Sequence, residues 1–381
     1  MRTWRARLTP FVRYVNILIP VMAVVVSLLI SAIPIALTGH SPLLAYREIL
    51  LGAFGNPIRI AVTLTKATPI LLSGLAVAIG FRSGVFNVGA EGQLYMGALG
   101  ATLVALGFPG LPAVFLLPFS LAAAFVFGAI WGLIPGYLKA ARNTNEVIIT
   151  IMMNFVAFWI VSYLVHGPMR DPTAMFSYSE KVPEAAMLPV LVTGTQLHAG
   201  YLMALVIGVI VHVLINYTSL GLQMRAVGGN PEAAQYAGMN TKRIMLLVFG
   251  LGGGIAGLAG ATEILGVQFR LADFFSAGYG WDGIGVTLVG GNTVFGIFLA
   301  SHFFGILRSG SSVMERRLGV PGAISLMIQG LAVFFTVVGV AIRIAQSPRL
   351  IEKPPSSDPE PVSTEPTEPA NEPGQHLSGL K

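Results

Sequence analysis

Three acidic side chains stand within long apolar stretches and could do chemistry inside a membrane. They are Glu91, Glu146 and Asp282. An ionisable group is expensive to place in a bilayer, so each of the three is a candidate functional residue. One use would be to carry protons in a transporter that is driven by an ion gradient. The alternative for Glu91 and Asp282 is that each caps the beginning of a helix.

The stretch around Glu91 is rich in glycine and polar residues. It reads GFRSGVFNVGAEGQLYMG over residues 80–97. Such a sequence favours irregular backbone, which survives at membrane depth only where protein buries it or where it lines a watery cavity. If Asn87 begins a helix, then Asn87, Glu91 and Tyr95 share one face of that helix. We predict that Asn87, Glu91 and Gln93 belong to a translocation pathway for a polar solute.

A second polar stripe begins at Glu146, in the segment TNEVIITIMMN. Glu146, Thr150 and Asn154 recur at helical spacing, so they share one face with Phe158. Polar side chains in membrane helices often join neighbouring helices by hydrogen bonds, so packing is the alternative to contact with a solute. We predict that Glu146, Thr150, Asn154 and Asp282 complete the translocation pathway.

Several motifs for catalysis or cofactor binding are absent or misleading. A Walker A loop needs GxxxxGK[ST], and the sequence has no Gly-Lys pair, so ATP hydrolysis would have to come from a separate subunit. Gly252, Gly254 and Gly257 match the dinucleotide fingerprint GxGxxG, but no strand precedes them. Gly253 and Gly257 instead predict a small-residue face for close helix packing. There is no cysteine, no metal-binding histidine spacing and no GxSxG motif, so no cofactor, metal site or enzyme activity is predicted.

The composition predicts that membrane helices carry these residues. Of the 381 residues, 54% are hydrophobic and 10% are charged, whereas about 25% of the residues in a soluble domain are charged. We therefore predict an all-α polytopic membrane protein. Arg2, Arg5, Arg7 and Arg13 precede a first apolar run that is longer than a signal peptide, which predicts an uncleaved anchor with a cytoplasmic N-terminus. No basic-aromatic patch indicates binding of nucleic acid.

The apolar runs divide the chain into a cytoplasmic N-terminal segment (1–16), a transmembrane domain (17–346) and a Pro/Glu-rich tail (347–381) that we predict to be disordered. About ten crossings are expected in the transmembrane domain. Eight are expected near residues 17–37, 60–81, 114–137, 147–165, 201–217, 244–265, 294–307 and 322–344, and broken crossings are expected at 80–97 and 274–291. This order leaves Arg308, Arg316 and Arg317 outside, against the usual preference for positive charge inside. A nine-crossing alternative would place these arginines inside and the tail outside.

The polar segment 218–243 separates two apolar runs and predicts a short helix. Asn230 is a good N-cap, Pro231 suits the first helical position, and Glu232 favours the first turn. Alanines continue the helix, and Gly238 can end it in the left-handed conformation. The flanking basic residues, which place this loop in the cytoplasm, are Arg225, Lys242 and Arg243.

Four segments resemble one family. RAVGGNPEAAQYAGM, residues 225–239, resembles the coupling-helix loop of type II ABC importer permeases, in the branch that carries simple sugars and nucleosides. FNVGAEGQ, residues 86–93, matches the FNxGxEGQ motif of nucleoside-type permeases, and the segment TNEVIITIMMN also matches. GYGWDGI, residues 278–284, is similar to a family motif in which phenylalanine is the more usual aromatic residue. The resemblance extends from the first crossing to about Ile344.

In that family the short helix docks into a groove on a separate ATPase subunit. The resemblance implies the same role here, with Ala234 facing the groove and small side chains allowing close approach. The residues to which it assigns this coupling role are Arg225, Gly229, Asn230, Pro231, Glu232, Ala233, Ala234, Ala237 and Gly238.

The resemblance also implies an assembly in the bacterial cytoplasmic membrane. It implies a second permease subunit (a copy or a paralogue), cytoplasmic ATP-binding subunits and an extracytoplasmic substrate-binding protein. Two inverted repeats are implied, formed by the second to fifth and the seventh to tenth crossings. The motif FNVGAEGQ favours nucleosides over ribose-like sugars as the solute. An ion-coupled secondary transporter is the rival class, although it has no use for a coupling loop, and an intramembrane enzyme is a weaker third option.

Overall fold

A computed structural model describes residues 3–346 of the chain. Contacts define one compact unit that ends at Ala341, and a second unit begins at Ile342 with the last residues of the final helix. The first helix already begins at Thr3, so most of the predicted N-terminal segment is helical. The tail that we predicted to be disordered, residues 347–381, lies outside the described residues.

Helices make up most of the described chain, as predicted for the all-α class. In chain order they are α1 (Thr3–Leu37), α2 (Pro42–Phe54), α3 (Pro57–Arg82), α4 (Ala90–Gly107), α5 (Ala113–Arg142), α6 (Glu146–His166), the 3₁₀ turn η1 (Glu184–Ala186), α7 (Gly200–Tyr217), α8 (Ser219–Gly229), α9 (Pro231–Tyr236), α10 (Thr241–Glu263), the π-helix η2 (Ile264–Gln268), α11 (Tyr279–Val289), α12 (Val294–Leu318) and α13 (Ala323–Gln346).

Eight helices within residues 3–346 are long and apolar enough to cross a membrane. They are α1 from Leu18 onward, α3, α5, α6, α7, α10 continued by η2, α12, and α13 as far as Arg343. Two further expected crossings correspond to α4, which has 18 residues but is not among the candidate spans, and to the shorter α11, which has 11 residues. The described chain therefore combines eight candidate spans with two helices, α4 and α11, that do not qualify as spans.

The helices α3 and α10 form the centre of the compact unit. In these two helices 78% and 72% of the most apolar window is buried, whereas no other candidate span exceeds 50%. Helix α3 packs against α11 and α12, and α10 packs in the same way against α4 and α5. The two halves of the chain thus repeat one set of contacts, as expected for the inverted repeats α3–α6 and α10–α13.

Glycines on α10 allow its backbone to approach α5 closely. A Cβ atom at Gly253 would lie 2.4 Å from the carbonyl oxygen of Gly128, and one at Gly257 would lie 2.3 Å from that of Ala124. Distances this short exclude any side chain, which confirms that Gly253 and Gly257 form a packing face.

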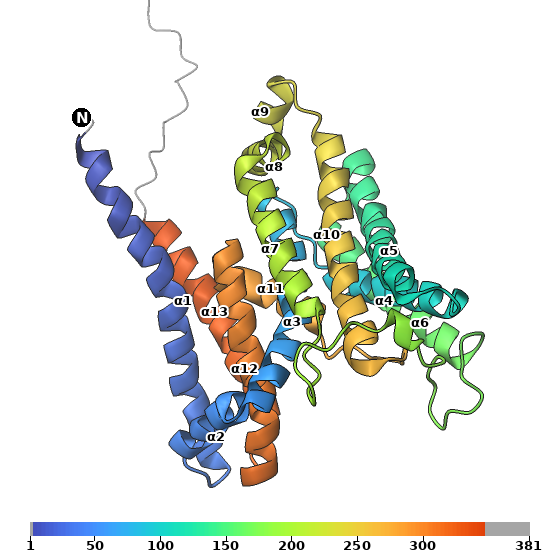
Figure 1. Ribbon diagram of the computed structural model, residues 1–381. Helices are drawn as coiled ribbons and strands as arrows, with labels where there is room; N and C mark the ends of the chain where they lie inside the picture. The colour runs from blue at the N-terminus through green and yellow to red at the C-terminus, as the bar shows by residue number, and fades with distance from the viewer. Residues whose placement is uncertain (1–2, 347–381) are drawn as a thin grey trace, which may run out of the picture. The chain divides into compact units, whose positions relative to one another are not determined.

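The two ends of the helices carry different structures (Figure 1). Helices α8 and α9 lie at one end, and α2 lies at the opposite end beside α12. The first end also contains Lys242 and Arg243 at the start of α10, so the positive-inside rule identifies it as the cytoplasmic end. The end that contains α2 is therefore the outer end.

The expected external position of Arg308 is wrong. Helix α12 runs without a break to Leu318, so Arg308 lies in its interior and not in a loop. Arg317 lies in the last turn, where its Nη1 is 2.8 Å from Oε2 of the buried Glu48 on α2. This ion pair balances one positive charge at the outer end of the helix, where the positive-inside rule disfavours it.

Candidate functional site

The first turns of α4 and α11 meet inside the protein at Glu91. Glu91 is the second residue of α4, and its Oε2 accepts a hydrogen bond of 2.6 Å from the backbone N–H of Gly280, the second residue of α11. The N–H groups at a helix start carry partial positive charge, so one carboxylate stabilises two helix ends. Glu91 is only 2% exposed. These contacts support the alternative that Glu91 caps a helix. The helix starts that it stabilises are those of α4 and α11, and both lie inside the protein.

Helices α4 and α11 leave this junction along different central helices. Leu94 and Gly97 of α4 lie against Gly260 and Gly257 in the outer half of α10. After α11 the chain reaches Asn292, whose carbonyl oxygen accepts a hydrogen bond of 2.9 Å from Nε of Arg82 at the inner end of α3. Helix α11 therefore runs inward beside α3, whereas α4 crosses the outer half of α10, and we call them the two half-helices. Discontinuous helices that start near the middle of the bilayer are typical of solute sites in transporters.

Asn87 and Gln93 hold the segment that leads into α4. Their side-chain amides are joined by two hydrogen bonds of 3.2 and 3.3 Å, and Oδ1 of Asn87 also accepts one from the N–H of Gly89 at 2.9 Å. Helix α4 begins only at Ala90, so the predicted helical face that includes Asn87 is wrong. The glycine-rich backbone favours this loop, in which Asn87 stabilises a turn.

Thr150 and Asn154 on α6 bind the same segment from the other side. Oδ1 of Asn154 accepts a hydrogen bond of 2.8 Å from the N–H of Gly92, and its Nδ2 donates one of 3.0 Å to the carbonyl of Val88. Oγ1 of Thr150 accepts one of 3.3 Å from the N–H of Val88. Both side chains are fully buried. These contacts support the alternative that Thr150 and Asn154 join neighbouring segments by packing, because both side chains bind backbone groups of the chain itself.

Glu146 is separated from this buried group. It lies in the first turn of α6, where its Oε2 is 3.1 Å from Nζ of Lys139 near the end of α5. The structure therefore brings together five of the predicted pathway residues and leaves Glu146 at the cytoplasmic connection. The five are Asn87, Glu91, Gln93, Thr150 and Asn154, each at most 2% exposed in this chain.

Asp282, the last predicted pathway residue, lies in the first turn of α11 and pairs with Arg308 of α12. Its Oδ2 lies 2.7 Å from Nη2 of Arg308, and that nitrogen also donates a hydrogen bond of 2.8 Å to the carbonyl of Ala277. Nζ of Lys66 on α3 donates one of 3.1 Å to the carbonyl of Arg308. Neither Lys66 nor Arg308 was predicted as a site residue, although a lysine within the apolar run of α3 was a visible signal.

The outer segment 167–199 covers η2 and the residues that follow it. The N–H groups of Ser179, Val182 and Leu188 donate hydrogen bonds of 2.9 Å to carbonyls between residues 265 and 271. Asp171 in this segment accepts hydrogen bonds from the side chain and the N–H of Thr173 and pairs with Arg270, and these contacts lower its pKa. These contacts hold the segment against the end of α10 and η2.

His198 anchors the end of that outer segment. Its ring is 1% exposed, and burial lowers the pKa of the imidazole to about 4. Nδ1 lies 3.2 Å from the N–H of Gly200 and accepts its hydrogen bond. A Cβ at Gly266 in η2 would lie 2.4 Å from Nε2 of His198, so the ring rests directly on the π-helix. A neutral imidazole therefore ties the start of α7 to the end of α10.

The predicted short helix in the loop 218–243 is present as α9. The side chain of Asn230 accepts a hydrogen bond of 3.0 Å from the N–H of Ala233, which confirms its N-cap role, and Pro231 occupies the first position. Gly238 has φ of +81°, which confirms the left-handed end. Helix α9 contacts α8 and α10 and presents its other side away from the membrane helices (Figure 1).

The expected orientation of Ala234 is wrong. Ala234 is 4% exposed and packs into the core of the chain, so it cannot face a partner without unfolding the loop. The residues on either side are exposed, and Tyr236 reaches 94% exposure. Tyr236 is the functional candidate that the sequence analysis missed, because the helix was too short for its buried face to be recognised from periodicity.

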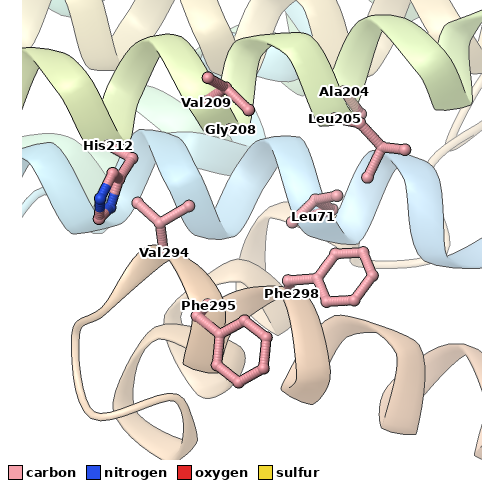
Figure 2. A pocket seen from close by; sticks show the side chains of 9 residues that line it. All are labelled: Leu71, Ala204, Leu205, Gly208, Val209, His212, Val294, Phe295 and Phe298. Atoms are coloured by element: carbon pink, nitrogen blue, oxygen red, sulfur yellow. The ribbon is translucent and has the colours of Figure 1, made fainter.

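An apolar groove of about 290 Å³ lies between α3, α7 and α12 and is separate from the half-helix junction. Figure 2 shows its lining side chains, with His212 as the one ionisable group. The lining residues are Leu71, Ala204, Leu205, Gly208, Val209, His212, Val294, Phe295 and Phe298. None of the predicted site residues lines this groove, and a polar solute would find few hydrogen-bond partners there.

Comparison with known proteins reveals close relatives over most of the chain. A glucose ABC transporter permease of Haloferax volcanii, TsgB13, is 38% identical over 328 residues, which cover 84% of this chain and 86% of that protein. The guanosine ABC transporter permease NupP of Bacillus subtilis is 37% identical over 337 residues, with coverages of 87% and 96%. The nucleoside ABC transporter permease NupB of Lactococcus lactis is 31% identical over 339 residues, with coverages of 86% and 93%. No solved structure matches the chain.

A protein family also matches this chain, over a range that includes α4, α9 and α11. Residues 59–337 match the family described as "Branched-chain amino acid transport system / permease component". This range begins in α3 and ends in α13. The chain therefore belongs to this family of ABC transporter permeases.

Proposed function

We propose that this chain forms the translocation pathway for nucleosides in an ABC importer. The observation that carries the choice of solute is the similarity to two nucleoside permeases, at 37% and 31% identity over most of the chain. The motif FNVGAEGQ, which contains Asn87, Glu91 and Gln93, supports the same choice. A simple sugar is the second candidate, because a relative at 38% identity is a glucose permease.

The buried polar group acts on this pathway by positioning its walls. Asn87, Gln93, Thr150 and Asn154 bind each other or the backbone around residues 88–92, and Glu91 binds the start of α11. In this proposal they keep the two half-helices in place while a solute passes beside them. Asp282 and Arg308 have the same role on the opposite side of α11.

Helix α9 passes mechanical work from an ATPase subunit to the permease. Its exposed side offers small residues around Tyr236, and aromatic side chains of this kind often anchor protein interfaces. Arg225, Gly229 and Glu232 belong to the same loop, and Ala234 supports it from within. Since no Gly-Lys phosphate loop is present in the sequence, hydrolysis takes place on the ATPase subunit.

Permeases of ABC transporters act with ATPase and substrate-binding partners. For this chain we propose two cytoplasmic ATP-binding subunits, a second permease subunit and an extracytoplasmic binding protein. The many apolar helices and the permease relatives indicate a multi-pass plasma membrane protein. The bacterial cytoplasmic membrane is the proposed location.

Uptake by the reconstituted complex tests the proposed solute. The full chain is placed in proteoliposomes with its ATPase subunits and binding protein, and uptake of radiolabelled guanosine, adenosine, glucose and ribose is compared. We expect ATP-dependent uptake of the nucleosides and little uptake of the sugars. Efficient uptake of sugars alone would move the assignment to the second candidate.

A further inference from the structure

The backbone before α11 is irregular and partly uncovered. Residues 269–278 connect η2 to α11, and Phe274 and Ala277 in this connection are exposed, Phe274 by 60%. Phe274 has φ of +48°, in the left-handed region that bulky residues rarely adopt. Strained backbone of this kind is concentrated at ligand sites and at switch regions.

One face of α11 is also uncovered. Trp281 is 40% exposed, and Ile284 and Leu288, which follow it at helical spacing, are partly exposed. A Cβ atom at Gly278 would lie 3.7 Å from Cδ1 of Trp281, so this face begins directly after the connection. The other faces are covered, because Gly280 contacts Glu91, Gly283 packs on Ser73 and Asp282 pairs with Arg308. These contacts on the other faces of α11 fix the position of the uncovered face.

Lipid does not suit this surface. Irregular backbone in the hydrocarbon region occurs only where protein buries it or where it lines a water-filled cavity. The connection 269–278 ends at the half-helix junction in the interior, next to the ion pair of Asp282 and Arg308. Charged side chains inside a membrane also face the protein interior or water. Water or a second protein surface must therefore cover the exposed face.

We propose that Trp281 and Phe274 form a stacking surface for the base of a nucleoside in transit. The inference rests on the proposed function and adds the residues that distinguish a nucleoside from a sugar. A base is a flat π-system that stacks on aromatic side chains with little dependence on its hydrogen-bonding groups. A surface of this type binds weakly enough to release the solute, and the strained backbone at Phe274 keeps that side chain at the surface.

Labelling of introduced cysteines tests whether water and solute reach this face. The chain contains no cysteine, so each variant carries a single thiol. We expect Ala277→Cys to react with a charged, membrane-impermeant thiol reagent, and guanosine to slow the reaction. The control is Trp159→Cys on α6, where Trp159 is 67% exposed on an apolar helix and should stay unlabelled. Absence of labelling at Ala277→Cys in the assembled complex would overturn the proposal.

Transport measurements test the role of the aromatic rings. Trp281→Leu and Phe274→Leu should each raise the KM for guanosine uptake by about fivefold or more, as expected from loss of a base-stacking contact. Trp281→Phe should retain low KM, and Trp159→Leu should behave as the unchanged protein. Assembly of the complex should be the same in all of these variants, and basal ATPase activity should be unchanged in the control Trp159→Leu.

Three results would overturn the proposal. The first is a KM for guanosine that Trp281→Leu leaves unchanged, and the second is an equal rise of that KM in the control Trp159→Leu. The third is separation of the permease pair in Trp281→Leu, which would identify the face as a contact with a second copy. These results differ from a failure of the proposed function itself. In that case the complex without any substitution would take up no nucleoside.

Discussion

At the scale of single residues, the chain buries polar groups in a membrane protein and pairs them with backbone. Glu91 binds Gly280, and Asn154 binds Gly92 and Val88. A buried polar group without a partner is costly, so these pairs stabilise one specific arrangement of loops that helix periodicity alone would not specify. The polar stripe on α6 therefore serves the packing of α4 first.

Asn154→Leu tests this packing role. The substitution leaves the N–H of Gly92 and the carbonyl of Val88 without their partner, and each unpaired group costs about 1–3 kcal/mol. We expect a melting temperature several degrees lower in detergent and less folded protein in the membrane. Met152→Leu, at an exposed position on the same helix, is the control. A normal melting temperature with altered solute preference would instead support direct contact between Asn154 and the solute.

His198 predicts a dependence of stability on pH. Burial lowers the pKa of this residue from 6.5 to about 4, so the unfolded chain binds a proton before the folded chain does. The stabilising contribution is complete above pH 6.5 and declines as the pH falls towards 4, by about 1.4 kcal/mol per pH unit within that window. Thermal unfolding from pH 7.5 to 4.5 measures it. His198→Gln should flatten the curve and His40→Gln should not, and identical curves for both variants would contradict this prediction.

At the scale of elements, three helices that are not candidate spans have positions of their own. The half-helices α4 and α11 place their first turns in the protein interior, and α9 lies outside the spans on α8 and α10. Helix α9 is only six residues long, so its stability depends on the Asn230 cap and on the burial of Ala234. A helix this short does not persist in water without such support.

Substitutions on the two faces of α9 should have different effects. Tyr236→Ala removes an exposed side chain, so the permease should fold normally, while affinity for the ATPase subunits falls about tenfold or more. Gln235→Ala, also at an exposed position, is the matched control. Ala234→Trp overfills a buried position and should displace the whole loop. Binding assays and limited proteolysis separate these effects, and normal ATPase binding in Tyr236→Ala would exclude it as an anchor.

At the scale of the whole molecule, the chain is one subunit of a larger machine. The outward side of α9 and the exposed face of α11 are the two faces to which we assign a partner and a solute. They belong to one fold in which each central helix packs against a half-helix and a long helix. If an ATPase subunit binds α9 as proposed, its movement would reach the half-helices through α10, which contacts α9, α3 and α4.

The energy source distinguishes an ABC importer from an ion-coupled transporter. In proteoliposomes with the ATPase subunits and the binding protein, uptake should require ATP and should persist after an ionophore collapses all ion gradients. Omission of either partner should abolish uptake. Uptake that follows an imposed proton or sodium gradient without ATP would assign Glu91 and Asp282 to ion transport instead.

Local features of this protein could be predicted from its sequence. Hydropathy predicted the eight candidate spans, because the length of an apolar run depends on nothing beyond the neighbouring chain. The cap at Asn230 and the left-handed Gly238 were likewise visible, since both follow from the side chain present at one position. The glycines at 253 and 257 indicated close packing for the same reason.

Only the tertiary structure decided what the polar residues contact. The partner of Glu91 is 189 residues away along the chain. Arg308 lies within α12, not in a loop, and it pairs with Asp282 on α11. Periodicity shows that residues share a face, but it does not show which distant element covers that face. The same limit applied to Ala234, because a six-residue helix is too short for its sequence to reveal the side that the rest of the fold buries.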